Sequence, residues 1–221
     1  MTPPSFISDG DESEYRREVD RLVSWCKDNN LVLNPQKTVE MVVDFRRNSV
    51  PPPPLEADGE TISSVDSFRF LGTTITRDLT WEHTIRALTA KAQQRLHFLR
   101  QLRRLKLPAK LLVQFYSATI QSILTSSITV WFAASTSRDK QRLQRIVRTA
   151  AKLTGTNLPS LDELYASRTR KRALRIITDS SHPGHSLFKP LPSGRRYRSV
   201  RTRTTRHKNS FFPTAVRLLN T

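Results

Sequence analysis

The spacing of apolar residues changes once along the chain, near Thr80, and this change limits the folds that are possible. Before Thr80, short β-branched and aromatic runs alternate with turn signals such as Asp58-Gly59. After it, apolar residues recur at helical spacing in one segment after another. The pattern predicts an α+β chain: a small antiparallel sheet with one helix, followed by a mainly helical bundle and a basic tail.

The first 80 residues are predicted to hold one amphipathic helix and several short strands. In residues 12–30, apolar side chains recur at helical spacing and charged side chains lie opposite them. Strands are expected where β-branched and aromatic residues alternate with polar ones. The predicted strands are residues 38–45, the two arms of a hairpin within 55–65, and residues 67–75, with residues 48–54 as an exposed proline-rich connector.

Four helical segments are predicted next, joined by short links into a mainly antiparallel bundle. Residues 109–132 are apolar nearly all round and are expected to form the buried central helix. Ser137 is expected to cap the third helix, which ends at Gly155. Ser160 and Glu163 have the spacing of a capping box for the fourth. The segments are residues 81–105, 109–132, 137–155 and 160–179.

Residues 180–221 combine turn residues and a dense arginine run with few apolar side chains. Apolar residues make up 37% of the chain, which is low for a compact globule. This tail is therefore expected to stay partly disordered until it meets a partner. The predicted domains are residues 1–80 (helix, strands and hairpin), 81–179 (helical bundle) and 180–221 (basic tail).

Positive charge is concentrated in the second part of the chain. From Lys91 onward there are 27 Lys and Arg against 4 Asp and Glu, whereas the residues before it hold 10 and 15. Like charges repel, and the phosphates of a nucleic acid would neutralise them with release of counterions. We therefore expect RNA or DNA as the partner; plain solvation of arginine-rich helices is the alternative.

The strongest candidates for phosphate contacts are arginines of the predicted helix at 81–105 and of the tail at 180–221. Arginine pairs bidentately with phosphate, and Tyr197 offers an aromatic face for an unpaired base. No base-reading module is recognisable, so little sequence preference is expected; a nuclear-import signal is another interpretation of the same arginines. The candidates are Arg95, Arg100, Arg103, Arg104, Arg195, Arg196, Tyr197, Arg198, Arg201, Arg203 and Arg206.

Several classes of site are not supported. No apolar run reaches the length of about 18 residues that a membrane span needs. Cys26 is the single cysteine, which excludes an intrachain disulfide and a multi-cysteine zinc site. A Pro-Gly pair separates His182 from His185, so no metal site is predicted. An intracellular location, nucleus or cytoplasm, fits best, and the oligomeric state stays open.

Three stretches, taken in order, resemble the reverse transcriptase of non-LTR (LINE-type) retrotransposons. Residues 7–47, with the "LNPQKT" motif, resemble the last palm segment after the catalytic aspartate pair. Residues 67–81, "SFRFLGTTITRDLTW", resemble the primer grip and the start of the thumb, and residues 84–221 resemble the thumb and connection. The resemblance implies a truncated palm within 1–80, a thumb and connection in 81–179, and a nucleic-acid partner, single-stranded or an RNA–DNA hybrid.

The resemblance also implies roles for single residues. Lys37 matches the palm lysine that acts as general acid for the pyrophosphate leaving group, and Leu71, Gly72 and Thr73 match the primer grip. The aspartate pair that would hold two magnesium ions has no counterpart before Ile7. We therefore expect a catalytically incomplete fragment without a cofactor, in which Lys37 is vestigial; magnesium is expected only if a complete palm lies upstream.

Residues 67–130 are also similar to an N-terminal segment of the eighth AlkB homologue. That family couples a 2-oxoglutarate-dependent dioxygenase to a tRNA methyltransferase, so the second hypothesis is an enzyme of this type. No histidine of this chain is followed two residues later by aspartate, as the dioxygenase triad requires. The third hypothesis is a decayed transposon relic without a cellular function.

Overall fold

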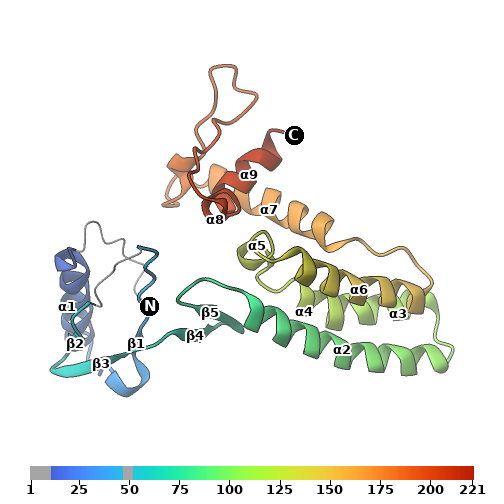
Figure 1. Ribbon diagram of the computed structural model, residues 1–221, viewed down its shortest axis with the longest axis horizontal. Helices are drawn as coiled ribbons and strands as arrows, with labels where there is room; N and C mark the ends of the chain where they lie inside the picture. Colours follow the sequence, from blue (N-terminus) through green and yellow to red (C-terminus); the bar gives the residue numbers. More distant parts are fainter. Residues whose placement is uncertain (1–10, 47–51) are drawn as a thin grey trace. The chain divides into compact units, whose positions relative to one another are not determined.

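The structure is a computed structural model that describes residues 11–46 and 52–221. The chain forms two compact units, Met1–Leu79 and Thr80–Thr221. Figure 1 shows helix α1 beside short strands in the first unit and mostly helices in the second. The predicted α+β class is confirmed at this level.

The first unit has a small core between helix α1 (Ser13–Asp28) and a short sheet. Val19 of α1 is buried together with Leu55, Ala57 and Ile62, as the amphipathic pattern predicted. The residue after the C-cap, Asn30, has a φ of 55°, a left-handed value that asparagine tolerates better than most residues. This helix therefore begins and ends close to where the sequence predicts.

The sheet under α1 is mixed rather than purely antiparallel, so this part of the prediction was wrong. Strands β2 (Leu55–Ala57) and β3 (Glu60–Ser64) form the predicted hairpin, and Asp58 and Gly59 have φ values of 56° and 79°. Strand β1 (Val39–Glu40) instead pairs in parallel with the end of β3.

Strand β1 is also much shorter than the predicted strand at 38–45. Val39 lies opposite Ser63 and Glu40 opposite Ser64, where β3 ends. One further bond, from the N–H of Val65 to the carbonyl of Glu40 at 2.9 Å, closes the ladder. Because β3 offers no more residues, the β-branched residues after Glu40 have no strand to pair with.

Residues 67–76 form a second hairpin, whereas a single strand was predicted at 67–75. Strand β4 (Ser67–Phe70) pairs antiparallel with β5 (Thr73–Thr76), and Phe70 lies opposite Thr73. The two linking residues, Leu71 and Gly72, have φ values of 46° and 83°. A two-residue hairpin turn of type I′ needs positive φ at both positions, and leucine rarely adopts such values. The alternation of apolar residues therefore concealed the turn.

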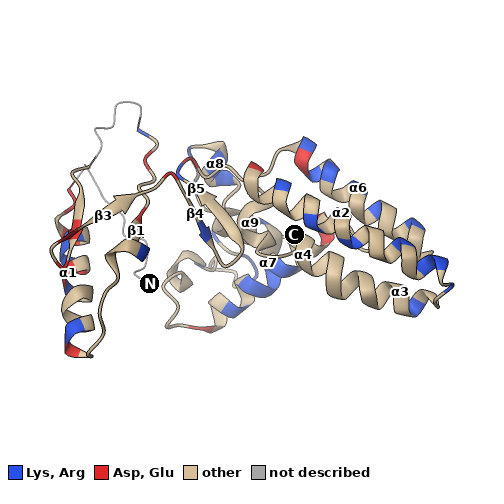
Figure 2. Cartoon of the chain, turned by 90° about the horizontal axis from the view of Figure 1, so that it is seen from below, with Lys and Arg blue, Asp and Glu red and all other residues tan. Residues whose placement is uncertain are grey.

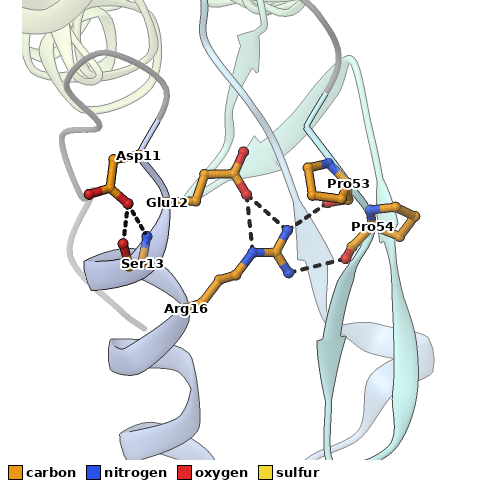
Figure 3. A network of polar contacts seen from close by, with 6 residues as sticks. All are labelled: Asp11, Glu12, Ser13, Arg16, Pro53 and Pro54. Atoms are coloured by element: carbon orange, nitrogen blue, oxygen red, sulfur yellow. Dashed lines mark hydrogen bonds and ion pairs between the residues drawn. The ribbon is translucent and has the colours of Figure 1, made fainter.

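Arg16 joins α1 to the described end of the proline-rich connector, part of which lies outside the described residues. Its guanidinium donates to Glu12 Oε2 from Nε at 3.1 Å and from Nη2 at 2.8 Å. The same group donates to the carbonyl oxygens of Pro53 at 2.8 Å and Pro54 at 3.2 Å (Figure 3). Prolines lack N–H groups, so their carbonyl oxygens are the polar atoms left to anchor this segment.

The start of α1 holds another local network. Asp11 accepts hydrogen bonds from the N–H of Ser13 at 3.0 Å and from its hydroxyl (Figure 3). These bonds, chiefly the one from the hydroxyl, lower the pKa of Asp11.

The second unit, all of which is described, contains eight α-helices around two cores. The first core lies between α2 (Glu82–Arg104), α6 (Ser137–Thr154) and the helices within 109–132, and the first turns of α7 (Leu161–Thr178) also reach it. The apolar residues that recur at helical spacing in α2 form one buried face: Ile85, Leu88, Ala92, Leu96 and Leu99 are buried, and Leu102 packs against them.

Residues 109–132 do not form the single buried helix that was predicted. The segment runs through α3 (Ala109–Phe115), the π-helix η2 (Tyr116–Gln121) and α4 (Ser122–Leu124), then breaks before α5 (Ile128–Trp131). Hydroxyls of Thr119, Ser122 and Thr125 donate to carbonyls four residues earlier, which weakens and bends helices. One face stays outside, since Leu111 is 46% exposed and Val130 48%.

Side chains satisfy the carbonyl groups that the break exposes. Ser127 has a φ of 48°, a left-handed value that interrupts the helical backbone. Arg168 of α7 donates to the carbonyl of Thr125 at 2.6 Å, and Trp131 Nε1 donates to that of Ser126 at 2.8 Å. The break is therefore held by α7 as well as by α5.

The predicted helix caps are largely confirmed. Thr136, rather than Ser137, is the N-cap of α6 and accepts a hydrogen bond from the N–H of Asp139 at 3.1 Å. Gly155 ends α6 with a φ of 70°. Ser160 and Glu163 form the expected capping box of α7, and the bonds from Ser160 lower the pKa of Glu163.

The tail folds back on α7 instead of staying extended, so the predicted disorder was wrong for this segment. It forms the short 3₁₀-helix η3 (His185–Leu187), α8 (Thr205–Lys208) and α9 (Phe211–Leu219). Phe188, Ala215 and Val216 are buried with Ala173 and Ile176 of α7. Contacts among the rings of Phe188, Phe211 and Phe212 contribute to this second core, so it needs few apolar residues and the overall composition hid it.

Tyr116 offers a test of the first core. Its side chain is fully buried in η2, its hydroxyl has no partner in the described structure, and burial raises its pKa to about 12. Tyr116→Phe should therefore raise the free energy of unfolding by about 1 kcal/mol. Between pH 10.0 and about 12 the phenol of Tyr116 ionises in the unfolded chain before it does so in the folded chain. The free energy of unfolding of the wild type should therefore fall as pH rises through this range, and it should fall less in the variant, which lacks the phenol.

The matched control is Tyr15→Phe. The hydroxyl of Tyr15 makes a hydrogen bond with Glu40, so this variant should lose stability. Urea unfolding followed by circular dichroism measures both changes. If Tyr116→Phe lowered the free energy of unfolding by more than about 1 kcal/mol, the hydroxyl of Tyr116 would have a hydrogen-bond partner after all.

Candidate nucleic-acid interface

The outward face of α6 carries a row of cations that we call the α6 stripe: Arg138, Arg142, Arg145, Arg148 and Lys152. All five are exposed. The opposite face of the same helix buries Leu143, Ile146, Val147 and Ala150 in the first core. Because the buried residues fix the rotation of the helix, the cations must point away from the core. The stripe extends over about 21 Å at 1.5 Å per residue.

No carboxylate neutralises the α6 stripe within the described residues. Asp139 is the one acidic residue of α6, and Thr136 at the cap donates to its Oδ2 at 2.7 Å. The stripe residues form no ion pair in the part of the chain that the structure describes, whereas in the first unit Arg17 and Arg21 pair with Glu14 and Glu18. Figure 2 shows blue segments of the ribbon, which mark Lys and Arg, repeated along α2, α6 and α7. The stripe thus presents uncompensated charge to solvent.

The predicted arginines of α2 differ in position. Arg95, Arg100 and Arg104 are exposed. Arg103 instead donates to the carbonyl of Lys152 at 2.9 Å, at the C-terminal turn of α6. A cation there completes the helix end and interacts favourably with its dipole. Arg103 therefore also joins α2 to α6.

The arginines of α7 mainly hold parts of the second unit together. Arg168 donates to the carbonyl of Thr125 at the break before α5, and Arg172 donates to Thr129 Oγ1 at 3.3 Å. Arg172 also lies over the ring of Phe211, 5.1 Å from its centroid. Arg170 donates to the carbonyl of Leu218 at 3.1 Å, at the end of α9. A shallow depression on the outer side of α7 lies among Ser167, Arg170, Lys171, Leu174, Arg175 and Thr178.

Three predicted arginines lie on a compact loop that spans residues 189–198. The N–H of Arg198 donates to the carbonyl of Lys189, and that of Leu191 donates to the carbonyl of Arg196, both at 2.7 Å. Gly194 turns the chain with a φ of 67°. Arg195, Arg196 and Arg198 are exposed on this loop, and Arg201, Arg203 and Arg206 are exposed beyond it.

Tyr197 contributes to the second core, which limits the stacking role predicted for it. Its ring lies edge-on to Phe188, with centroids 6.1 Å apart. The side chain of Asn220 bonds the N–H and the carbonyl of Tyr197, both at 2.9 Å. This pair of bonds holds the arginine loop against the end of α9.

Lys37 and the grip-like residues lie on different elements of the first unit. Lys37 is exposed at the end of the 3₁₀-helix η1 (Pro35–Lys37), where its N–H donates to Asn34 Oδ1 at 3.1 Å. Leu71, 81% exposed, and Gly72 form the turn between β4 and β5, and Thr73 is buried at the start of β5. The sequence predicted the tight turn before Lys37 but not the hairpin of the grip-like residues.

The described residues contain no group of three metal-binding side chains. Gly184 donates its N–H to His182 Nδ1 at 3.0 Å, and His185 Nδ1 lies 3.2 Å from the carbonyl of Ile176. Both histidines thus shape the turn after α7. Among residues 11–46 and 52–221 no helix has the length and hydropathy of a membrane span.

Sequence reasoning missed the α6 stripe. The interpretation of residues 137–155 used the spacing of the apolar residues and not that of the cations between them. Arg138, Arg145 and Lys152 recur every seven residues, which is two helical turns. This repeat was the available signal.

Comparison with known proteins gives two partial matches. Over 81 residues, 37% of this chain, the chain is 32% identical to "Probable RNA-directed DNA polymerase from transposon BS" of Drosophila melanogaster. That stretch is 9% of the Drosophila protein. Residues 81–122 match the family described as "Alkylated DNA repair protein alkB homolog 8, N-terminal". A search of solved structures found no match.

These matches confirm both resemblances seen in the sequence. The chain is distantly related to a non-LTR transposon reverse transcriptase. The segment shared with the AlkB homologue begins at Trp81, just before α2, and ends at the start of α4.

Proposed function

We propose that the helical unit binds RNA or DNA through phosphate contacts, largely without sequence preference. The main observation in support is the α6 stripe, which consists of five exposed cations on one helix face with no carboxylate among them. The exposed arginines of α2 and of the 189–198 loop extend the same chemistry. The relation to a polymerase named as RNA-directed supports nucleic acid as the partner.

The charge of the α6 stripe is costly unless an anion is bound. Exposed cations about one helical turn apart repel each other, and this repulsion disfavours the compact state. A phosphate backbone places negative charges at regular intervals and releases condensed counterions when the cations bind. A membrane surface fits less well, because the side chains between the stripe residues, Gln141 and Thr149, are polar rather than apolar.

In this proposal the chain binds nucleic acid and does not copy it. Lys37 could act as general acid, and Leu71, Gly72 and Thr73 as a primer grip, only beside a carboxylate pair that held magnesium. The segment shared with the AlkB homologue consists of helices of the first core, and neither of its histidines, His83 and His97, is followed two residues later by aspartate. Binding is therefore the activity that the described residues support best.

A titration by fluorescence anisotropy tests this proposal. The purified full chain is added at low salt to labelled single strands of several unrelated sequences and to an RNA–DNA hybrid. We expect binding to each, with affinities within about tenfold of one another, because phosphate contacts carry no sequence information. No binding at low salt, or binding to one sequence alone, would overturn the proposal.

A further inference from the structure

Phe98 on α2 is an exposed aromatic ring among cations. Its side chain is 48% exposed. The guanidinium carbon of Arg95 lies 5.8 Å from the ring centroid. The ring of His97 stands edge-on to it, with centroids 5.8 Å apart and an interplanar angle of 75°. A large apolar side chain is thus held in a polar, positively charged setting.

The rest of α2 fixes the position of this ring. Leu96 and Leu99, on either side of Phe98, are buried in the first core. If α2 rotated so that Phe98 faced the core, Leu96 and Leu99 would have to leave the core. Lys91 and Arg95 precede Phe98 by seven and three residues, so they lie on the same side of the helix and both are exposed. The ring therefore continues a row of cations.

The nearest acidic residue on α2 does not reach this row. Glu82 lies at the first turn and pairs with Arg86 at 2.7 Å. Sites for single-stranded nucleic acid combine cations that follow the backbone with aromatic rings on which bases stack. Lys91, Arg95 and Phe98 supply both components on one face of one helix.

We propose that Phe98 is a stacking platform for an unpaired base, with Arg95 and Lys91 binding the adjoining phosphates. This inference rests on the proposed function and names its substrate class, a single strand with accessible bases. It assigns the stacking role to Phe98 in place of Tyr197, whose ring packs in the second core. A single exposed phenylalanine is common on protein surfaces and does not by itself indicate a ligand site. In the part of the chain that the structure describes, the cations beside Phe98 form no ion pair, which favours nucleic acid over an apolar protein partner.

The test compares two ligands that differ only in their bases. One is oligothymidylate, and the other is an abasic deoxyribose-phosphate strand of the same length. The full chain should bind oligothymidylate about 5- to 100-fold more tightly. Phe98→Ala should bring its affinity down to that of the abasic strand and leave the abasic affinity unchanged, whereas Phe98→Trp should keep the preference.

Phe68→Ala is the matched control, since Phe68 is also exposed, at 40%, but lies on β4 in the first unit. It should leave the ratio of the two affinities unchanged. Circular dichroism should show full helicity in every variant, because alanine and tryptophan are both tolerated at exposed helix positions.

Each outcome separates the two proposals. If the wild type binds neither strand at low salt, the proposed function fails. If it binds both strands equally, or if Phe98→Ala keeps the preference for bases, the stacking platform fails and phosphate binding stands. If Phe98→Ala changes the sedimentation of the protein but not the ratio, the ring is a protein contact and the stacking platform is wrong.

Discussion

Replacing all five residues of the α6 stripe with glutamine should weaken binding of a single strand by about 10²- to 10³-fold near 0.1 M salt. On a single strand each cation that contacts a phosphate releases about 0.7 counterions, so five contacts set an upper bound above this range. Glutamine removes the charge but keeps a polar side chain and a high helix propensity, and the buried face of α6 is unchanged. Anisotropy titrations of variant and wild type at the same salt concentration measure the loss.

A control that removes three paired cations, compared per removed charge, separates this effect from net charge alone. Arg17, Arg21 and Lys27 lie on α1 and pair with Glu14, Glu18 and Asp58. Their replacement with glutamine should change affinity by less than about threefold, since these cations already have partners. Equal losses per removed charge in the two variants would show that the position of the α6 stripe does not matter.

Trp131→Ala should lower the free energy of unfolding of the helical unit by about 3 to 5 kcal/mol. Trp131 is fully buried, and its ring stands edge-on to Phe132 with centroids 5.8 Å apart. Alanine would leave a cavity in the first core. It would also leave the carbonyl of Ser126, now bonded by Trp131 Nε1 at 2.8 Å, without this donor. Denaturant unfolding followed by circular dichroism at 222 nm measures the change.

Trp25→Ala is the control for that loss. Trp25 on α1 is 55% exposed, so its removal should cost less than about 1 kcal/mol. Comparable losses from the two substitutions would mean that residues 109–132 do not pack as described. The same comparison would then also question the break at Ser127.

Local signals predicted the helix ends well. Gly155 and the Ser160–Glu163 capping box act through bonds within a few residues, so the sequence alone contains the whole interaction. The Asp58-Gly59 turn is predictable for the same reason. Burial on α2 follows from periodicity, which is also local.

Features that depend on distant residues were missed. The break after α4 depends on Arg168, 43 residues from the carbonyl of Thr125 that it binds. The length of β1 depends on where β3 ends. Leu71 adopts a left-handed φ that its own side chain disfavours, so pairing of β4 with β5 outweighs local preference.

The sequence predicted the positive charge of the candidate interface but not which of its residues face solvent. The excess of cations after Lys91 predicted a polyanion partner. Composition could not separate Arg103, which also binds the end of α6, from Arg100 and Arg104. Nor could it show that Tyr197 packs on Phe188 while Phe98 stays exposed, because both are aromatic residues beside arginines. Only the fold determines which ring faces solvent.

The salt dependence of binding tests the central claim most directly. If the helical unit binds phosphates through its exposed cations, the logarithm of the binding constant of the full chain should fall linearly with the logarithm of salt concentration. We predict a slope of about −3 or steeper for a single strand, which corresponds to four or more phosphate contacts at about −0.7 each. A slope near zero would contradict the account, because affinity would then come from something other than this charge.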